Sequence, residues 1–150
     1  MEVRGDTRFA VGAYAVVTNA AGEVLLTRRR DGHEWVLPGG SVKEREAPWE
    51  AVIRETREET SLQIELTKLV GVYVKRAERD IVFVFAATPR LGLPRPSEER
   101  DRVEFFRHGK LPPETSERDL ERIEDAVAGA ERPVLSVQPS AGGSPRAGTR

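Results

Sequence analysis

Three glutamates with helical spacing are the residues of this chain best placed to do chemistry. Glu55, Glu58 and Glu59 stand in a run whose apolar and polar residues recur at the three- and four-residue spacing of an amphipathic helix. On a helix that turns about 100° per residue, with Ala47 as the zero direction, they point to about 80°, about 20° and about 120°. The spacing therefore predicts one helix wall that carries three carboxylates.

A wall of this kind suits a hard cation. Like charges at helical spacing destabilise a helix by about 0.2–0.5 kcal/mol per pair. Mg²⁺ or Mn²⁺ would neutralise them, because both prefer oxygen ligands and leave coordination sites for water and phosphate. The alternative is a solvated acidic helix face, which is what most charge runs are. Spacing alone leaves both interpretations open.

The residues around the glutamates supply a setting for such a site. Leu37-Pro38-Gly39-Gly40 breaks the preceding strand and lets the backbone approach closely, so the Gly40 carbonyl is a candidate metal ligand. Arg54 lies beside Glu55 and could orient that carboxylate or hold it ionised. The opposite wall of the helix, at about 140° to 240°, should pack on the core. It consists of Trp49, Val52, Ile53 and Thr56.

The segment from Gly40 to Leu62 resembles the Nudix box. That pattern is Gly, five residues, Glu, seven residues, Arg-Glu, an aliphatic, any residue, Glu-Glu, any residue, Gly and an aliphatic. Seven positions match at the correct spacing: Gly40, Glu46, Arg54, Glu55, Glu58, Glu59 and Leu62. Thr56 replaces an aliphatic, and Ser61 replaces the glycine past the helix end. Serine in a left-handed cap would cost about 1 kcal/mol, unless the helix ends differently.

The resemblance implies a fold and a reaction. The fold is a Nudix-type α/β/α sandwich (α+β), with a mixed sheet between helices, over about Phe9 to Ala130. The reaction is hydrolysis of a diphosphate linkage in a nucleoside diphosphate derivative, with Mg²⁺ or Mn²⁺ as cofactor. Glu58 and Glu59 would be the primary metal ligands, with the Gly40 carbonyl assisting, and Glu55 would be a ligand or the general base.

Further roles follow from the same resemblance. Glu46 would hold Arg54 in place, with a capping or surface role as the alternative. The family's base also occurs on loops outside the box, where Glu98 and Glu99 are the candidates here. Glu99 is preferred, because an acidic residue four positions before the valine of the next strand is common in similar sequences. A solvated loop glutamate is the alternative.

Substrate contacts can be proposed from residue type and position. The end of a predicted strand carries three arginines, Arg28, Arg29 and Arg30. Because alternate side chains of a strand face the same way, Arg28 or Arg29 could bind phosphates through two parallel hydrogen bonds. A solvated strand end is the alternative. Trp35 could stack on a base or belong to the core or its rim. Gly39 and Gly40 would allow the close backbone approach.

Composition sets the broad class. The 150 residues, 38% hydrophobic and 33% charged, fit a globular domain at residues 1–137 with a disordered tail at 138–150. A net charge of -1 predicts no strong nucleic-acid or membrane attraction. The lack of cysteine excludes disulfides and thiolate metal sites. With no signal peptide or apolar span, we expect a cytoplasmic protein that binds a small-molecule nucleotide, with a homodimer possible.

The expected elements come from periodicity and breakers. Residues 8–19 and 23–29 read as a hairpin, and residues 88–100, with three prolines, as a loop. A second helix should carry an apolar stripe of Leu120, Ile123 and Val127. The remaining predictions are a short extended piece at 35–37, helices at about 47–60 and 117–130, and strands at 62–75, 80–87 and 102–106.

Two competing functions remain at this stage. A Nudix-fold nucleotide-binding or regulatory module would keep the fold without catalysis, although such a module has no reason to keep all three box glutamates. A prenyl diphosphate isomerase is disfavoured, because no cysteine is present to serve that chemistry. Substrate identity stays open among a nucleoside triphosphate, a nucleotide sugar, a capped RNA end and a damaged nucleotide.

Overall fold

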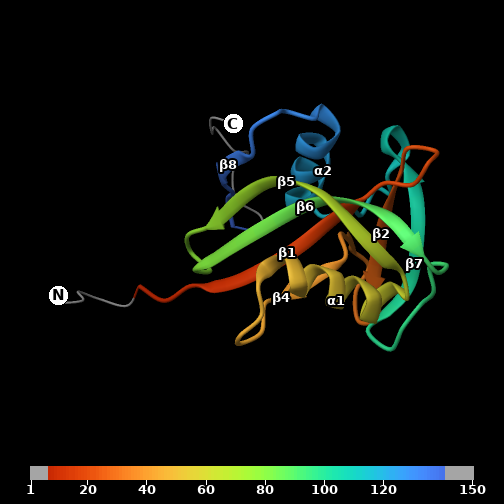
Figure 1. Cartoon of the computed structure of the whole chain (residues 1–150), viewed down its shortest axis with the longest axis horizontal. Helices are drawn as coiled ribbons and strands as arrows, with labels where there is room; N and C mark the ends of the chain where they lie inside the picture. Colours follow the sequence, from red (N-terminus) through yellow and green to blue (C-terminus); the bar gives the residue numbers. More distant parts are fainter. Residues whose placement is uncertain (1–6, 141–150) are drawn as a thin grey trace.

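A computed structural model describes residues 7–140. Two sheets share the molecule: a five-stranded sheet of order β4-β1-β6-β5-β8 and a three-stranded sheet of order β3-β2-β7. None of the helices within residues 7–140 has the length and apolar character of a membrane span. The elements, labelled in Figure 1, are β1 (Ala10–Val17), β2 (Glu23–Arg29), β3 (Trp35–Val36), β4 (Gly39–Ser41), α1 (Pro48–Thr60), β5 (Gln63–Lys75), β6 (Asp80–Leu91), β7 (Arg100–Arg107), a 3₁₀ turn (His108–Lys110), α2 (Glu117–Ala128) and β8 (Val134–Val137).

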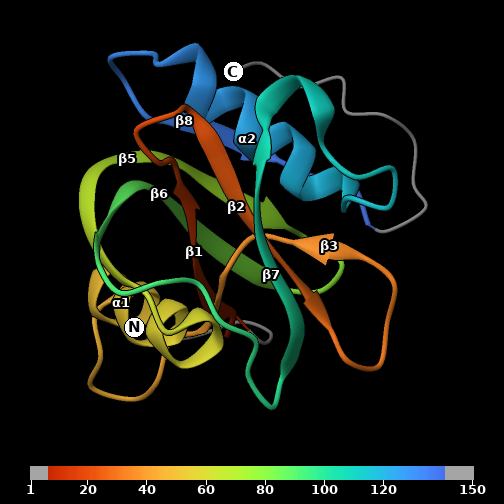
Figure 2. The same cartoon turned by 90° about the vertical axis from the view of Figure 1, so that its right-hand side faces the viewer.

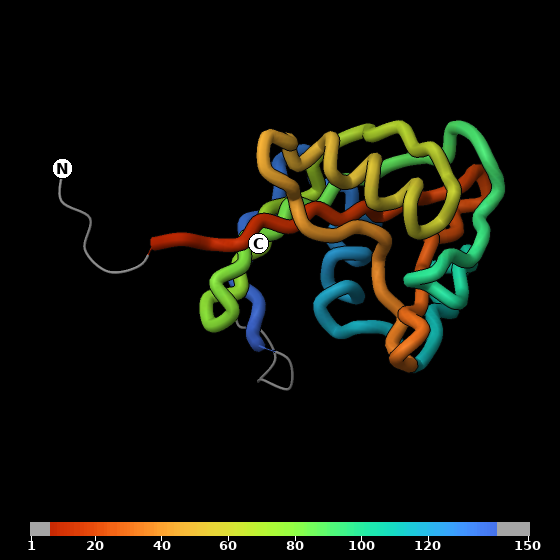
Figure 3. The backbone as a smooth tube through the Cα atoms, turned by 90° about the horizontal axis from the view of Figure 1, so that it is seen from below, coloured from red at the N-terminus to blue at the C-terminus, as the bar shows by residue number. Residues whose placement is uncertain are grey.

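The five-stranded sheet is mixed and lies between the two helices. β1 pairs with β6 in parallel and with β4 antiparallel, while β5 pairs antiparallel with β6 and parallel with β8. Seen from below, α1 and α2 lie on opposite sides of the strands (Figure 3). The predicted α/β/α sandwich with a mixed sheet is therefore confirmed.

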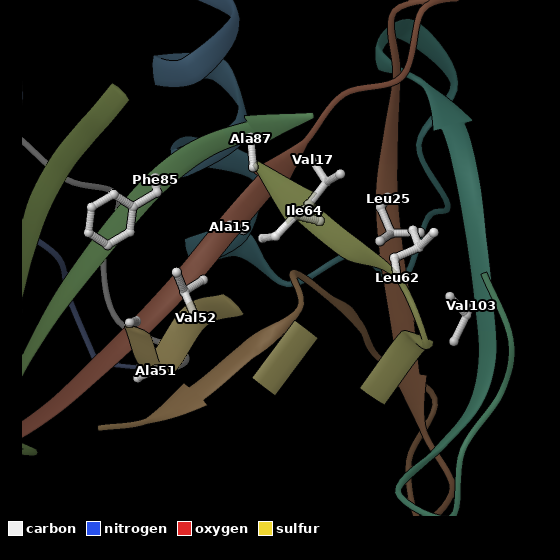
Figure 4. Close-up of a cluster of buried hydrophobic side chains, with 11 residues drawn as sticks. Ala15, Val17, Leu25, Ala51, Val52, Leu62, Ile64, Phe85, Ala87 and Val103 are labelled. Atoms are coloured by element: carbon white, nitrogen blue, oxygen red, sulfur yellow. The ribbon is translucent and has the colours of Figure 1, made fainter. Parts of the chain in front are cut away.

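Each helix closes one half of the core. On the α1 side, Ala51 and Val52 pack toward Ala15, Ile64 and Phe85 of the sheet, as Figure 4 shows. On the α2 side, Ile123 belongs to a second cluster with Leu37, which lies between β3 and β4, and with residues of several strands. The strand residues are Val16, Val24, Leu26, Trp35, Val70, Tyr73, Val82 and Val84. Alternate residues of β1 point into the two clusters, which makes it a central strand.

The predicted hairpin of the first two strands is wrong. β1 and β2 belong to different sheets and share only an isolated bridge between Thr18 and Val24. Figure 2 shows β2 beside β3 and β7, with β1 in the larger sheet. The physical reason is that β4 and β6 occupy the two edges of β1, so that no edge is left for β2 to pair with. A β-branched run predicts a strand but does not choose its partners.

Two other strands, β6 and β8, also differ from the prediction. β6 continues to Leu91, inside the segment expected to be a loop, and Pro89 lies opposite Ile64 at a register shift of the β5–β6 ladder. A bulge accepts a proline because it interrupts the ladder hydrogen bonds. β8 was not predicted, since it is only four residues long and follows a proline. The β5–β6 ladder also shifts register between Leu69 and Gly71.

The helices turn different faces to the core than their apolar residues predict. On α1, Trp49 and Ile53 are 58% and 39% exposed, and Glu59 is 1% exposed. The buried face of α1 is therefore centred nearer Glu59 than the predicted wall. On α2, Val127 is exposed, while Asp119, Arg122 and Asp125 are buried beside Ile123. Small residues such as Ala51 let α1 lie close to the sheet, which rotates the larger apolar side chains outward.

The structure describes the first three residues of the predicted tail, 138–140. Gln138 is 3% exposed, and its side chain accepts hydrogen bonds from Arg122, so this residue packs with the domain. Pro139 and Ser140 are exposed. The rest of the predicted tail, residues 141–150, lies outside the described residues.

Candidate active site

Three carboxylates from two segments meet beside β4. Oxygens of Glu55, Glu59 and Glu99 all lie within 4.8 Å of one another. Glu55 and Glu59 come from successive turns of α1, and Glu99 comes from the loop that enters β7. We call these three residues the acidic cluster. The packing of α1 against β4 and β1 brings them together.

Glu59 is the buried member of the acidic cluster. Its Oε1 accepts the Gly39 N–H at 3.1 Å, and its Oε2 accepts Nη2 of Arg100 at 2.8 Å. Burial raises the pKa of Glu59 to about 7, against the opposing effects of Arg100 and the Gly39 N–H, while Glu55 and Glu99 raise it further. A negative charge here is thus costly, and a cation beside it would relieve that cost.

Arg100 is a site residue that sequence reasoning missed. It is 6% exposed and its guanidinium reaches Glu59 from the first residue of β7. Its Nε has no hydrogen-bond partner in the structure. The available signal was an arginine directly after Glu99, at the start of a strand that has to pack on the box helix.

The two glycines of the Pro-Gly-Gly turn are required by close contacts. Gly39 has φ +147°, and a Cβ there would lie 2.3 Å from the Ala13 carbonyl oxygen. A Cβ on Gly40 would lie 2.7 Å from Cδ of Glu55. The backbone of β4 therefore runs directly against the acidic cluster, and side chains at these positions would displace it.

The register of β4 bears on the Gly40 carbonyl. Backbone hydrogen bonds join β1 to the chain two residues before and two residues after the Ala13–Gly40 pair. Because bonded and non-bonded pairs alternate in an antiparallel ladder, this pair is of the bonded type. The Gly40 carbonyl is directed toward β1, so its second lone pair is the one that a metal could use.

Arg54 connects the acidic cluster to the start of the box. It donates two hydrogen bonds to Glu46, at 2.7 and 3.0 Å, so the pairing expected from the sequence is present. It also donates to Glu55 at 3.0 Å and to Glu58 at 3.2 Å. The bond from Arg54 is the main cause that lowers the pKa of Glu46 to about 2.

Glu58 is not part of the acidic cluster. Its side chain is 51% exposed and is held only loosely at the surface by Arg54. On the helix it lies about 100° from Glu59, which points inward. The structure thus groups Glu55, Glu59 and Glu99, and it leaves Glu58 at the rim.

The predicted substrate contacts fall in different surroundings. Arg28 donates to Asp101 at 3.0 and 3.3 Å and lies 5.9 Å from the centroid of the Trp35 ring. Trp35 is 7% exposed and meets Phe106 edge to face, so its ring lies within the core. Arg29 is 64% exposed and stands opposite Arg100 in the β2–β7 pair, on the sheet face nearer the acidic cluster.

A divalent cation fits the donor set of the acidic cluster. Three carboxylates provide hard oxygen ligands, and the charges within residues 7–140 that contact them, from Arg54 and Arg100, neutralise them only in part. Glu99 is exposed, which leaves one side of the cluster open to water and a phosphate. Oxygen donors with open positions are typical of Mg²⁺ and Mn²⁺ sites.

Comparison with known proteins decides the family. The model of the NUDIX domain matches residues 8–126. The chain belongs to the Nudix family. It is 36% identical over 125 residues to a MutT-like protein of Streptomyces ambofaciens, an alignment that covers 81% of this chain and 79% of that protein. Membership of the family, together with this relative, indicates a pyrophosphohydrolase.

Solved structures of the family share the fold. A Nudix hydrolase from Nitrosomonas europaea superposes with a TM-score of 0.77 at 21% identity, covering 87% of this chain and 79% of that one. A MutT Nudix hydrolase from Burkholderia pseudomallei superposes with a TM-score of 0.70 at 27% identity, covering 79% of this chain and 98% of that one.

Proposed function

We propose that this Nudix hydrolase uses Mg²⁺ or Mn²⁺ at the acidic cluster to cleave a diphosphate linkage in a nucleoside diphosphate derivative. The observation that supports the proposal is the convergence of Glu55, Glu59 and Glu99 within 4.8 Å beside the Gly39–Gly40 backbone. A non-catalytic nucleotide-binding module would not need this concentration of incompletely neutralised carboxylates. A cytoplasmic location stays an expectation of the sequence.

The ion would be held by the acidic cluster, with the Gly40 carbonyl and a reoriented Glu58 as further donors. When bound, it supplies positive charge to the phosphoryl oxygens and lowers the pKa of a water. Glu59 is held in one orientation by the Gly39 N–H and Arg100, which fixes a ligand before the ion arrives. Arg54 does the same for Glu55.

Glu99 is the residue we propose as the general base. It is the exposed member of the acidic cluster, whereas Glu59 is buried and Glu55 is engaged by Arg54. Water oxygen would attack one phosphorus while Glu99 takes its proton, and the bridging oxygen would leave with the other phosphate. Arg29, exposed on the same side, is the proposed contact for substrate phosphates.

A substrate panel with product analysis tests the function. Nucleoside triphosphates, nucleotide sugars, capped RNA and oxidised nucleotides would be assayed with Mg²⁺ and with a chelator, in ¹⁸O-labelled water to locate the attacked phosphorus. Glu99→Gln should lower kcat by about 10²–10⁴-fold. Its neighbour Glu98→Gln is the matched control and should keep most of the activity. Equal losses in both variants, or full activity in chelator, would reject the proposal.

A further inference from the structure

Three consecutive carbonyls of the loop before β7 converge on one arginine. Arg30 donates from Nε to the Glu98 carbonyl at 2.7 Å and to the Ser97 carbonyl at 3.2 Å, and from Nη2 to the Ser97 carbonyl at 2.9 Å. Its backbone N–H donates to the Glu99 carbonyl at 3.4 Å. The planar guanidinium fork suits this task, because its donors are fixed relative to one another.

Two hydrogen bonds within the loop also join Ser97 to Arg100. The Ser97 N–H donates to the Arg100 carbonyl at 2.8 Å, and the Arg100 N–H donates to Oγ of Ser97 at 3.1 Å. This turn fixes the path of the backbone from Ser97 to Arg100. With the carbonyls turned toward Arg30, the Glu99 side chain reaches the acidic cluster, and Arg100 reaches Glu59.

We infer that Arg30 is a positioning residue, which holds the 97–99 loop so that Glu99 completes the acidic cluster. The inference rests on the proposed function, since it assigns Arg30 a role at that same site. Arg30 acts on carbonyl oxygens of the loop and not on phosphate. The three arginines at the end of β2 and directly after it thereby have different contacts: Arg28 binds Asp101, Arg29 faces solvent, and Arg30 binds the loop.

Arg29→Gln and Arg30→Gln form a matched pair of variants. Both remove one positive charge at adjacent exposed positions, so a difference between them reports the hydrogen bonds of Arg30 and not the local potential. Two readouts apply in the whole 150-residue chain without nucleotide. They are the Mn²⁺ affinity, from the electron paramagnetic resonance of the free ion, and the hydrogen exchange of the amides at residues 97–100.

Arg30→Gln should bind Mn²⁺ about 3–10-fold more weakly than Arg29→Gln, the loss expected for one or two net hydrogen bonds. Amide exchange at residues 97–100 should rise by a similar factor. Arg30→Lys should recover part of the affinity, because one ammonium can reach one carbonyl. In a Glu99→Gln background, Arg30→Gln should weaken Mn²⁺ binding no further, since its effect passes through Glu99.

Equal Mn²⁺ affinities and equal exchange rates in the two variants would overturn the role of Arg30 while leaving the proposed function intact. The role would also be overturned if Arg30→Gln weakened Mn²⁺ binding as much in the Glu99→Gln background as it does in the unsubstituted protein. Failure of the proposed function looks different, because the unsubstituted protein would then bind no Mn²⁺ at the cluster. In that case, amide exchange at residues 97–100 would by itself test whether Arg30 holds the loop. Faster exchange in Arg30→Gln would support this role, and equal rates would overturn it.

Discussion

The two faces of the central sheet each bury charged groups, and they differ in how those charges are balanced. On the α2 face, Asp119, Arg122 and Gln138 form what we call the α2 network. Arg122 donates to Asp119 at 3.0 Å and to Gln138 at 2.9 and 3.2 Å, with its guanidinium 5.5 Å from the ring centroids of Tyr14 and Tyr73. The buried cation and carboxylate of this network are matched within the fold, and the other buried carboxylate of α2, Asp125, accepts a hydrogen bond from the Tyr73 hydroxyl at 2.7 Å.

The acidic cluster on the α1 face is not balanced in that way. Three carboxylates lie within 4.8 Å of one another, and two cations among residues 7–140 contact them. Arg100 pairs with Glu59 at 2.8 Å, and Arg54, which is shared with Glu46 and Glu58, pairs with Glu55 at 3.0 Å. The pKa of Glu59 rises as a result of burial and of its acidic neighbours. Buried charge that the fold neutralises by itself serves structure, whereas buried charge left in excess favours binding of a cation.

The α2 network and the acidic cluster both accept hydrogen bonds from the same backbone turn. The Leu37 N–H donates to Asp119 at 3.1 Å, and the Gly39 N–H donates to Glu59 at 3.1 Å. Carboxylates from opposite faces of the sheet thus hold backbone amides two residues apart. The turn that carries the glycines of the site is positioned jointly by the α2 network and the acidic cluster.

Breaking the α2 network should have the largest effect on stability. Arg122→Met leaves Asp119 buried without its cation, and we expect a loss of about 3–5 kcal/mol in the free energy of unfolding. Urea denaturation measures the loss. Arg118→Met, on the same helix in a more exposed pair with Glu78, is the control and should cost less than about 1 kcal/mol. Equal losses would refute the contrast between balanced and surface charges.

Adding a divalent ion should act on the other face. At an Mn²⁺ concentration 100 times its Kd, the unsubstituted protein should gain about 2.7 kcal/mol of stability, because the ion binds the folded state. Thermal unfolding with and without a chelator measures this gain. Glu59→Gln removes a ligand of the acidic cluster and should gain much less. Equal stabilisation of both proteins would place the ion elsewhere.

Crowding the acidic cluster tests its contact with β4. Gly40→Ala puts a methyl group 2.7 Å from Cδ of Glu55, at the end of a side chain that can move aside, so we expect weaker Mn²⁺ binding with a stability loss of only about 1 kcal/mol. Gly32→Ala is the control, because no atom lies within 4 Å of a Cβ at that position. Unchanged metal affinity in Gly40→Ala would argue against Glu55 as a ligand.

The ends of the two helices give the smallest and most local test. Ser61 caps α1 with φ +67°, and Gly129 caps α2 with φ +64°. Ser61→Gly should stabilise the protein by about 0.5–1 kcal/mol, and Gly129→Ala should destabilise it by about as much, since only the serine position now carries left-handed strain. Equilibrium unfolding measures both changes, and effects of the same sign would contradict this reasoning.

The sequence by itself determined the local features of the protein. The box spacing predicted α1 to within one residue, the Glu46–Arg54 pair and the two close-packed glycines. It also indicated that Ser61 would take a left-handed cap if α1 ended as in relatives, and the structure shows that cap. These features depend on helix periodicity, on backbone sterics and on residues near one another in the chain.

Only the tertiary structure decided which carboxylates meet. A helical wheel gives the angles between Glu55, Glu58 and Glu59 but not the rotation of α1 against the sheet, which turned Glu59 inward and Glu58 outward. Arg100 and Arg30 act across sequence distances of 41 and 67–68 residues, so no local pattern reveals their partners. The predicted pairing of β1 with β2 was wrong for the same reason. Local propensity indicates where strands form, but long-range packing determines which strands pair.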